Sequence, residues 1–446
     1  MTKLFEIQCW LKNFYRRGAR FQRYTRELST TYLYTPEQLA SYQNNLLKKM
    51  IRHCYTNVPY YRETFQSLGL TPDDIQTPDD LQKLPIIDKS TVQADIKRFI
   101  SKKHFNVLCN IGKTSGSTGT PGKFIRDFDA INFEHACVWR YWQNAGDNGK
   151  RRLCLRGDII VPSSQTEPPF WRYNPANMEL QMSSYHLSRQ NSIHYIQKIL
   201  EFQPKIMFVG PSMAHVLAKF FKLHNMNYQF DAIFTSSESL EPKVRQYIEE
   251  VFQCKTFDWY GQAERVAAVG QCQTGSYHIQ EDYSVVELIP GFEEGSYEMV
   301  GTHLHNFAMP LLRYRTKDFI YQKPGAARVE TCACGSSFRT LDSIMGRAYG
   351  YLLTPEGYHI AITSSIPIGV DNIIETQFYQ ERQGEVILKV LSNGRFTELD
   401  RERLIANTIK HTSPLMQVRV EEVDEIPRGP NGKFINIINK IPVSLN

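Results

Sequence analysis

The period of the apolar positions changes along the chain, and it predicts helices first and mixed α/β structure afterwards. From Thr35 to about Ile100 the apolar residues recur with a helical period, which turn signals such as the two TPDD stretches interrupt. Short β-rich runs then alternate with amphipathic helices, as in RLCLRGD from Arg152, KIMFVG from Lys205, DAIFTSSES from Asp231 and KTFDWYG from Lys255. Such alternation is typical of an α/β sheet.

After Gly275 the pattern changes to strands joined by Gly and Pro turns, which indicates a β-rich, antiparallel or barrel-like subdomain. Beyond Arg347 the strand-like EVILKVL and QVRVEEV flank the helical LDRERLIANTIKHT, over about 100 residues, the size of a small domain. We therefore expect an α/β fold. A large domain over residues 35–346 holds α/β sheet subdomains and the β-rich subdomain, and a small, mobile α+β domain covers residues 347–446.

The first 34 residues form a separate basic segment. Residues 1–27 hold seven Lys or Arg against two Glu, although the net charge of the whole chain is only +6. Apolar side chains interleave with these charges, at Phe5, Trp10, Leu11, Phe14, Tyr15, Phe21 and Tyr24. Two interpretations stay open: a basic amphipathic helix on an anionic membrane or a partner, or a helix packed on the core with a solvated basic face.

Composition restricts the class of protein further. The 446 residues are 41% hydrophobic and 22% charged, which is ordinary for a globular protein and excludes disorder and fibres. We find no membrane-length apolar stretch and no signal peptide, so we expect a cytoplasmic protein, with peripheral binding at the inner face of the membrane as an alternative. Nucleic acid is not an expected partner, because the chain beyond the basic segment is nearly neutral. Nine widely spaced cysteines indicate reduced thiols.

The stretch TSGSTGTPGKF, from Thr114 to Phe124, is rich in glycine and hydroxyl side chains. Such a composition suits a loop whose backbone amides and hydroxyls close around phosphate oxygens. It is not a Walker A loop, because no Gly-Lys-Ser/Thr ends it. Taken alone, it is either a phosphate-binding loop or a polar connection between two elements.

Four further motifs follow this loop in order: YGQAE at Tyr260–Glu264, LLRYRTKD at Leu311–Asp318, the pair Gly346 and Arg347, and PRGPNGK at Pro427–Lys433. Together the five motifs resemble those of the adenylate-forming superfamily. The stretch from NVPYYRETF through LQKLPIIDKSTV is similar to the phenylacetate-CoA ligase and CapK-like branch, whose CapK-like members are associated with the biosynthesis of capsular or other surface polysaccharides. The resemblance covers about residues 35–440. It implies an ATP-using, AMP-forming ligase that activates a carboxylate as its acyl-adenylate.

The resemblance also implies a nucleotide site. Its phosphate contacts would come from Thr114, Ser115, Gly116, Ser117, Thr118 and Gly119, with help from Lys123. Ser237 and Glu238 would line the adenine pocket, and Tyr260, beside Gly261, would stack on the base. Asp318 would accept the ribose hydroxyls, Arg347 would contact the ribose or a phosphate, and Glu264 would hold Mg²⁺.

Lys433 is the expected catalytic lysine, because a compact ammonium on a flexible stem can reach the α-phosphate and the carboxylate with a moving domain. The sequence departs from the family pattern at two positions. Gly350 stands near the usual acidic hinge residue, and Lys317 stands where glycine is common. Because of the hinge difference, the resemblance supports formation of the acyl-adenylate more strongly than the second half-reaction, in which the acyl group passes to an acceptor.

Four residues form a candidate metal site: Cys272, His278, Cys332 and Cys334. Thiolates with one imidazole suit tetrahedral structural Zn²⁺, although the spacing is not that of a standard zinc finger. The alternative is a set of reduced thiols in turns and a buried histidine.

Three hypotheses for the function differ in their products. The first is the ligase, which passes an aryl, acyl or amino acid to an amine or hydroxyl of a glycan precursor, or to coenzyme A. The second is a non-catalytic nucleotide-binding scaffold in an envelope-polysaccharide pathway, docked through the basic segment. The third, a P-loop NTPase, lacks its Walker lysine. AMP with pyrophosphate, no turnover, and ADP distinguish the three.

Overall fold

The structure is a computed structural model that describes residues 2–103, 109–113, 122–147, 149–291, 294–324, 331–347, 352–360, 366–367, 369–427 and 434–441. The chain divides into two compact units. The first comprises Met1–Lys150, Asn174–Met178 and Phe257–Gly346, and the second Arg151–Tyr173, Glu179–Thr256 and Arg347–Asn446. The division into domains at residues 34 and 346 stays a prediction.

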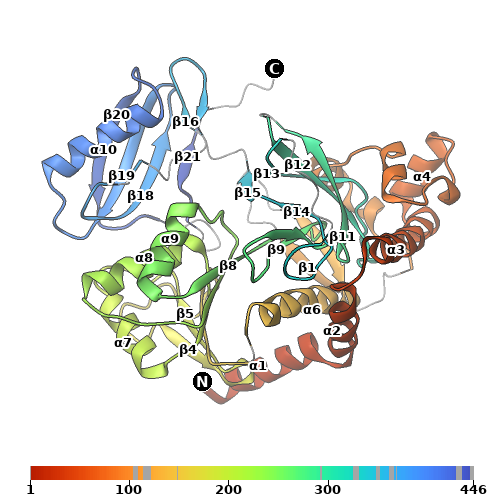
Figure 1. The fold of residues 1–446 in the computed structure, drawn as a ribbon, viewed down its shortest axis with the longest axis horizontal. Helices are drawn as coiled ribbons and strands as arrows, with labels where there is room; N and C mark the ends of the chain where they lie inside the picture. The colour runs from red at the N-terminus through yellow and green to blue at the C-terminus, as the bar shows by residue number, and fades with distance from the viewer. Residues whose placement is uncertain are drawn as a thin grey trace. The chain divides into compact units, whose positions relative to one another are not determined.

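Helices dominate the first part of the first unit, as the helical period predicts (Figure 1). They are α1 (Thr2–Arg17), α2 (Ala19–Thr31), α3 (Pro36–Asn57), α4 (Pro59–Ser67), α5 (Lys89–Ala94) and α6 (Phe128–Asn144), with short 3-10 turns at Pro72–Asp74, Pro78–Lys83 and Ile96–Phe99. Local sequence sets the start of α3. Thr35 and Gln38 form a reciprocal capping box, and Pro36 occupies the first helical position.

The strands of the first unit are antiparallel. β1 (Cys109–Lys113) pairs with β2 (Lys123–Asp127). The strands β8 (Lys255–Gly261), β9 (Ala268–Gln271), β10 (Tyr277–Ile279) and β14 (Thr340–Leu341) pair in that order. A four-stranded sheet follows, in the order β11 (Ser284–Pro290), β12 (Ser296–His303), β13 (Tyr314–Tyr321) and β15 (Ser343–Arg347). The prediction of a β-rich region after Gly275 is thereby confirmed.

One glycine allows two of these segments to approach closely. A Cβ atom on Gly301 of β12 would collide with the backbone carbonyl of Val266. Glycine alone fits such a contact. The sheet that carries β13 is therefore held directly against the segment that follows β8, where the YGQAE motif lies.

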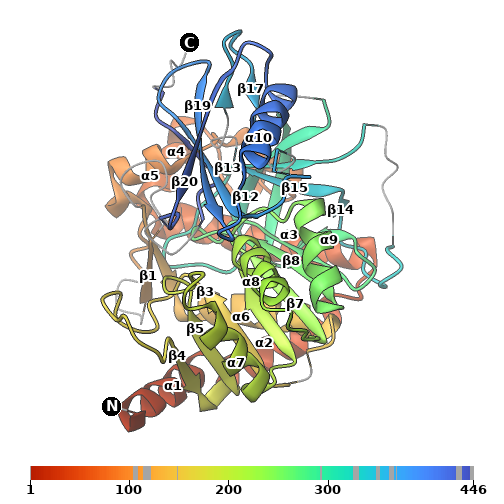
Figure 2. The same cartoon turned by 90° about the vertical axis from the view of Figure 1, so that its left-hand side faces the viewer.

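The second unit contains a parallel sheet in the order β5 (Glu179–Ser183), β3 (Arg152–Arg156), β6 (Ile206–Val209) and β7 (Ala232–Ser236). The strand β4 (Trp171–Asn174) precedes β5 in the chain, and the turn Pro175–Asn177 between the two strands belongs to the first unit. Helices α7 (Ser192–Phe202), α8 (Pro211–Leu223) and α9 (Pro242–Phe252) pack their apolar sides on these strands, around Ile199, Leu217 and Ile248 (Figure 2). This is the α/β alternation that the sequence predicts.

The C-terminal part of the second unit has its own small core around Phe378, Leu388 and Leu404. Its mixed sheet runs in the order β20 (Gln417–Val423), β19 (Glu385–Ser392), β18 (Ile373–Gln380) and β21 (Ile437–Asn439). Helix α10 (Glu398–His411) begins at a capping box of Thr397 and Asp400. The small strands β16 (Leu352–Leu353) and β17 (His359–Ile360) form a separate pair. The structure agrees with the predicted α+β pattern.

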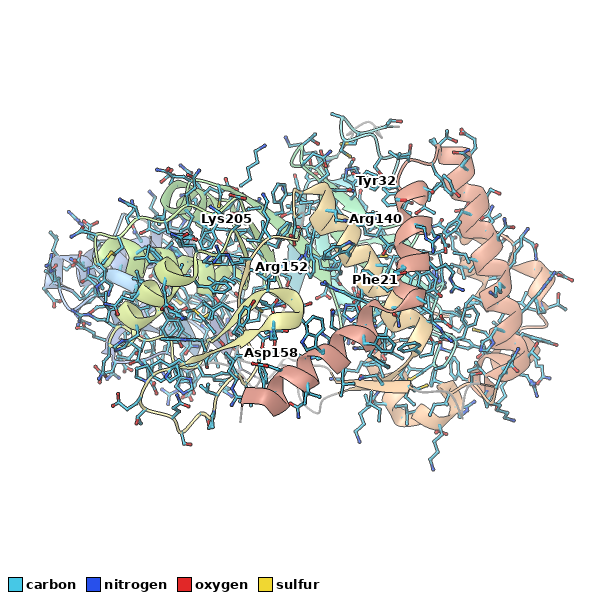
Figure 3. The ribbon with its side chains drawn as sticks, turned by 90° about the horizontal axis from the view of Figure 1, so that it is seen from below. Phe21, Tyr32, Arg140, Arg152, Asp158 and Lys205 are labelled. Carbon is cyan, nitrogen blue, oxygen red and sulfur yellow. The ribbon has the colours of Figure 1, made fainter. Side chains whose placement is uncertain are left out.

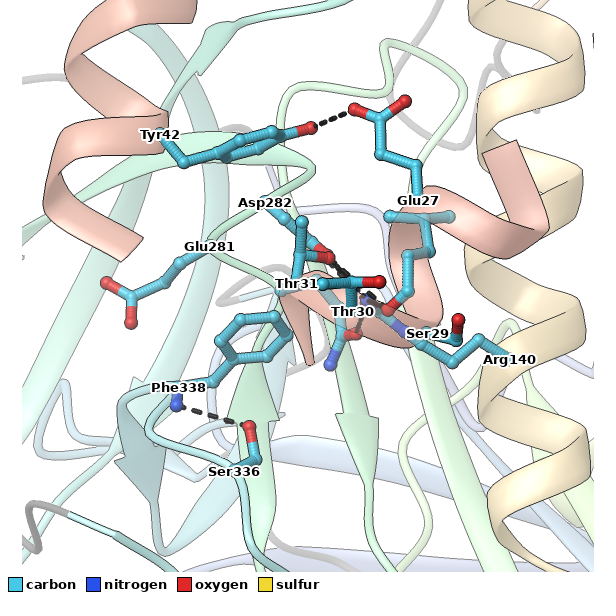
Figure 4. Close-up of polar contacts among 12 residues, drawn as sticks. Glu27, Ser29, Thr30, Thr31, Tyr42, Arg140, Glu281, Asp282, Ser336 and Phe338 are labelled. Carbon is cyan, nitrogen blue, oxygen red and sulfur yellow. Dashed lines mark hydrogen bonds and ion pairs between the residues drawn. The ribbon is translucent and has the colours of Figure 1, made fainter. Parts of the chain in front are cut away.

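A buried ion pair joins three segments of the first unit. The side chains of Arg140 on α6 and Asp282 after β10 are 5% and 0% exposed, and Arg140 Nη2 donates to Asp282 Oδ1 at 3.1 Å. The same guanidinium donates to the carbonyl of Leu28, and the Thr31 hydroxyl donates to Asp282, so α2 is included (Figure 4). Burial opposes the charge of Arg140, but the carboxylate of Asp282 outweighs it and raises the arginine pKa.

Replacement of Asp282 by Asn is expected to reduce the free energy of unfolding by about 3–5 kcal/mol, because it leaves the Arg140 charge buried without its counter-charge. Urea denaturation followed by circular dichroism measures this loss. Arg20→Gln is the control. It removes the exposed pair of Arg20 with Asp129, whose side chains are 49% and 45% exposed, and should cost less than about 1 kcal/mol. Equal losses in the two variants would contradict the prediction.

Candidate functional site

Two residues of different predicted motifs meet in the first unit. The hydroxyl of Tyr260, near the end of β8, donates to Asp318 Oδ2 on β13 at 2.7 Å. Asp318 is only 6% exposed, and its backbone amide donates to the Thr316 hydroxyl at 3.1 Å. The carboxylate is thereby oriented before any ligand arrives.

Lys317, beside Asp318, has a φ of 60°, in the left-handed region that favours glycine. Glycine would adopt this backbone conformation without strain, whereas a lysine there must be held by its surroundings. The Lys317 amide donates to Glu298 Oε1 at 3.1 Å, and Arg315 pairs with the same carboxylate at 3.1 Å. Glu298 on β12 thus holds the unusual backbone in place.

Glu264 is a second buried carboxylate, with 5% exposure. The Tyr314 hydroxyl donates to its Oε1 at 3.0 Å. His303 Nδ1 accepts from the Leu311 amide at 3.1 Å, so the proton is on Nε2, which donates to the Glu264 carbonyl at 2.8 Å. Burial lowers the pKa of His303 to about 4, so this histidine is neutral at pH 7. Side chain and backbone of Glu264 are both fixed.

An arginine ties the hairpin of β1 and β2 to the same region. The Arg126 guanidinium on β2 donates to the carbonyl of Ala263, next to Glu264. Gly112 on β1 leaves room for that guanidinium, because a Cβ atom there would overlap it. The hairpin register pairs Lys113 with Lys123, the two residues that flank the glycine-rich loop. The strands on either side of the glycine-rich loop are therefore hydrogen-bonded to the YGQAE motif, through Arg126 and Ala263.

Positive charge gathers beside this carboxylate. Burial lowers the pKa of Arg126, and the neighbouring charge of Arg265 lowers it further. Arg265 itself pairs with Glu134 on α6. Buried or half-buried guanidinium groups beside a carboxylate create a potential that favours a polyanionic ligand. Such a region suits the phosphates of a nucleotide together with a cation.

Several predicted site residues lie outside the described residues. They are Thr114, Ser115, Gly116, Ser117, Thr118, Gly119 and Lys433, together with Gly350 at the hinge. Arg347 ends β15, and its side chain is also outside the description. Lys123 is exposed, and its backbone amide donates to Gln93 Oε1 at 3.2 Å. Gly261 is the last residue of β8.

Ser237 and Glu238 belong to the second unit, after the carboxyl end of β7. Ser237 has a φ of 79°. Glu238 Oε2 accepts from the Ser212 amide in the first turn of α8 at 3.0 Å, and Oε1 accepts from the Phe434 amide at 3.3 Å. Glu238 therefore caps the start of α8 and contacts the residue that follows Lys433.

The four residues of the candidate metal site come together. One ligand atom from each of Cys272, His278, Cys332 and Cys334 lies within 4.8 Å of the others, and Cys334 Sγ lies 3.5 Å from His278 Nε2. The other ring nitrogen of His278 lies 3.0 Å from the carbonyl of Phe338, the arrangement common for metal-binding histidines. These distances suit tetrahedral coordination.

Two similar turns present the cysteines. The Gly275 amide donates to the Cys272 carbonyl at 2.9 Å, and the Gly335 amide donates to the Cys332 carbonyl at 2.8 Å. Gly275 and Gly335 have φ values of 96° and 89°, which favour glycine. Sequence spacing did not reveal that C-x5-H and C-x-C would form matching turns.

The electrostatics of this cluster favour a thiolate. The hydrogen bond with Cys334 lowers the pKa of the Cys272 thiol, and the one with His278 lowers it further. The same bond to Cys272 raises the pKa of Cys334, since the two sulfur atoms share one proton. A thiolate is the form of cysteine that binds metal.

Sequence reasoning missed several residues that complete these sites. Tyr314 lies within LLRYRTKD but was not singled out, and Arg126 carries no motif signal. At the cysteine cluster, the Tyr32 hydroxyl donates to Cys334 Sγ at 3.1 Å, and Thr274 Oγ1 lies 3.0 Å from Cys272 Sγ. Tyr314 could have been found from the sequence, because it lies inside a motif. Tyr32 could not, because it is far from the cysteines in the sequence.

Comparison with known proteins agrees with this geometry. Residues 352–440 match the family model of the CapK C-terminal domain. The chain is 26% identical to Protein CapK of Staphylococcus aureus over 420 residues, which cover 90% of this chain and 89% of that protein. It is 25% identical to the phenylacetate-coenzyme A ligase of Escherichia coli strain K12 over 336 residues, which cover 71% of this chain and 73% of that enzyme.

Solved structures confirm the fold. The crystal structure of 2-hydroxyisobutyryl-CoA ligase in the postadenylation state, in complex with R3-HIB-AMP, superposes with a TM-score of 0.70 at 16% identity, over 92% of this chain and 91% of that one. The predicted resemblance to the CapK and phenylacetate-CoA ligase branch is confirmed, as is the α/β fold. The predicted class of enzyme, an AMP-forming carboxylate ligase, agrees with these relatives.

Proposed function

We propose that this chain activates a carboxylate with ATP. A carboxylate oxygen of the substrate forms a bond to the α-phosphorus of ATP, and the bond from the α-phosphorus to the bridging oxygen of the β-phosphate breaks. The products are the acyl-adenylate and pyrophosphate. An acceptor nucleophile then takes the acyl group and releases AMP. The observation that carries the proposal is the joining of two nucleotide motifs by two hydrogen bonds, from Tyr260 to Asp318 and from Tyr314 to Glu264.

The two buried carboxylates have different roles in binding the nucleotide. Asp318, held by Tyr260, is an acceptor for the two ribose hydroxyls, and the ring of Tyr260 offers a face to the base. Glu264 fits Mg²⁺, since its carboxylate supplies the hard oxygen that this cation prefers. Bound Mg²⁺ neutralises charge on the phosphates. We assign the glycine-rich loop, from Thr114 to Gly119, to the β- and γ-phosphates, with Arg126 anchoring its hairpin.

For the acceptor of the acyl group, we propose an amine or hydroxyl of a surface-polysaccharide precursor. The wider coverage by Protein CapK and the match to its C-terminal domain support this choice. The alternative acceptor, coenzyme A, is supported by the phenylacetate-coenzyme A ligases among the relatives. Because ATP, the proposed substrate, is a cytoplasmic nucleotide, we propose that the reaction takes place in the cytoplasm.

The test is a panel of aryl, fatty and amino acids, followed by release of pyrophosphate and AMP with and without coenzyme A. Carboxylate-dependent AMP and pyrophosphate support adenylation. Release that does not depend on coenzyme A favours a glycan or amine acceptor, and coenzyme A thioester formation favours the alternative. No turnover with any acid, with nucleotide still bound, would support the scaffold hypothesis instead.

Lys433→Ala is expected to reduce carboxylate-dependent exchange between ATP and pyrophosphate by about 10²–10³-fold, because one preorganised charge in the transition state is lost. ATP affinity should stay nearly unchanged. Asp318→Asn should show the opposite pattern, with weakened ATP binding. Exchange assays and isothermal titration calorimetry separate the two effects.

Lys440→Ala is the matched control, an exposed lysine in the same C-terminal stretch, and should retain activity. Exchange near the wild-type rate in Lys433→Ala would contradict the assignment of the catalytic lysine. Unchanged ATP affinity in Asp318→Asn would contradict the assignment of the ribose contact.

We also propose that the cysteine cluster binds one structural Zn²⁺. The convergence of Cys272, His278, Cys332 and Cys334 supports this, and so does the backbone carbonyl behind His278. A metal there would link the turn after β9 to the turn before β14. Its role would be to stabilise the β-rich region rather than to take part in the reaction.

Purified protein is expected to contain about one zinc per chain by elemental analysis, and Cys272→Ser with Cys334→Ser should remove it. The same double variant should lower the Tm by roughly 5 °C or more, since a link between two distant turns is lost. Cys109→Ser, at an exposed thiol, is the control and should keep its zinc. Zinc-free protein from a preparation without chelators would refute the site.

A further inference from the structure

Helix α1 is fixed to the first unit along one side. Cys9 is buried, the ring of Tyr15 lies 4.5 Å from that of Phe128 on α6, and the guanidinium of Arg17 lies 4.5 Å from the ring centre of Trp139. Ring and cation–π contacts of this kind hold a helix in a defined rotation about its axis. The remaining side of α1 therefore faces outward in a defined direction.

That outward side is apolar. Ile7, Trp10, Leu11 and Phe14 are 55%, 56%, 64% and 79% exposed. Their spacing of three, one and three residues places all four on one side of the helix. Figure 3 shows α1 in front of the ribbon in the view from below. A helix that merely packs on the core would bury such a stripe.

The two interpretations of the basic segment therefore apply to different helices. On α2, Phe21 and Leu28 are buried, and Tyr24 packs edge-on to Phe133 of α6 at 5.2 Å, so this helix packs on the core with a solvated basic side. On α1 the apolar stripe stays exposed. Of these two helices, it is α1 that leaves an apolar surface available for binding.

The segment that carries the stripe is positively charged. Residues 1–27 have a formal charge of +5, which leaves about +1 for the rest of the chain. Lys12 and Arg16 are also exposed on α1, on the side of the helix away from the stripe. Further along, Arg20 and Arg23 share the carboxylate of Asp129, at 3.1 and 3.8 Å. A partner for this face must therefore be both apolar and negatively charged.

We propose that α1 docks on the surface of an anionic lipid bilayer. Its apolar stripe would enter the boundary between headgroups and acyl chains, and the net positive charge of residues 1–27 would attract the anionic headgroups. The helix would lie in the membrane plane. Its 16 residues span about 24 Å, which is less than the thickness of about 30 Å of the hydrocarbon core. None of the helices in the described residues has the length and apolar character to cross a bilayer.

A second copy of the chain fits this face less well. Pairing of two stripes would bring two segments of +5 together, and like charges at that distance repel. An anionic bilayer instead neutralises the charge and covers the apolar residues at once. The proposal is independent of the adenylation activity, since α1 carries none of the residues assigned to the nucleotide.

Co-sedimentation of the full chain with lipid vesicles tests the proposal. We expect binding to vesicles with about 30 mol% anionic lipid, weak binding to neutral phosphatidylcholine vesicles, and release by salt. The double variant Trp10→Ser with Phe14→Ser should lose at least about tenfold in affinity, because it removes the two aromatic side chains of the stripe. The double variant Lys12→Gln with Arg16→Gln should bind anionic vesicles more weakly and with a smaller salt dependence, because it lowers the positive charge of the segment.

The double variant Leu399→Ser with Leu415→Ser is the matched control, because these leucines are 54% and 66% exposed outside α1. It should bind vesicles like the wild type. Retained exchange between ATP and pyrophosphate, with an unchanged circular dichroism spectrum, would show that the α1 variants are folded. If the proposed activity is absent, the spectrum alone serves this purpose.

Three results would overturn the proposal. One is equal binding of the wild type and the Trp10 and Phe14 double variant. Another is binding that does not depend on anionic lipid. The third is a wild-type dimer in light scattering that Phe14→Ser dissociates, with no vesicle binding, which would assign the stripe to a second copy.

Discussion

The buried contact between Arg140 and Asp282 is the interaction on which the arrangement of the first unit depends. A buried charge is tolerated only beside its counter-charge and with its hydrogen bonds satisfied, so this pair permits little variation in the positions of its elements. It holds α6, α2 and the segment after β10 together. That segment leads from His278 in the cysteine cluster to the sheet that carries Asp318. One ion pair thus supports both candidate sites.

The residues proposed to bind the nucleotide depend on a second constraint, the orientation of carboxylates that are buried before a ligand binds. Tyrosine hydroxyls supply it, from β8 to Asp318 and from β13 to Glu264. The neutral His303 fixes the backbone at Glu264, and Arg126 ties the hairpin of β1 and β2 to Ala263, the residue before it. Acceptors that are already oriented lose little entropy when the nucleotide arrives, which is the physical advantage of such preorganisation.

The basic segment shows where periodicity is insufficient. Apolar residues at helical spacing occur in both α1 and α2, and the pattern alone does not tell which stripe meets the core. In the folded chain Phe21 and Leu28 of α2 meet α6, whereas Trp10 and Phe14 of α1 remain exposed. Lys317 is a similar case, because only the folded chain shows that it has a positive φ and that Glu298 holds its backbone.

The amino-acid sequence alone determined the helical entry segment, the α/β alternation and the β-rich region, and it singled out Glu264, Asp318 and the cysteine cluster as candidates, because periods, caps and motifs are carried by neighbouring residues. The partners that orient those residues were decided by tertiary structure. Tyr314 is 50 residues from Glu264, Arg126 is 137 from Ala263, and Tyr32 is 302 from Cys334. A hydrogen bond requires atoms about 3 Å apart, and only the folded chain brings such distant residues to that distance.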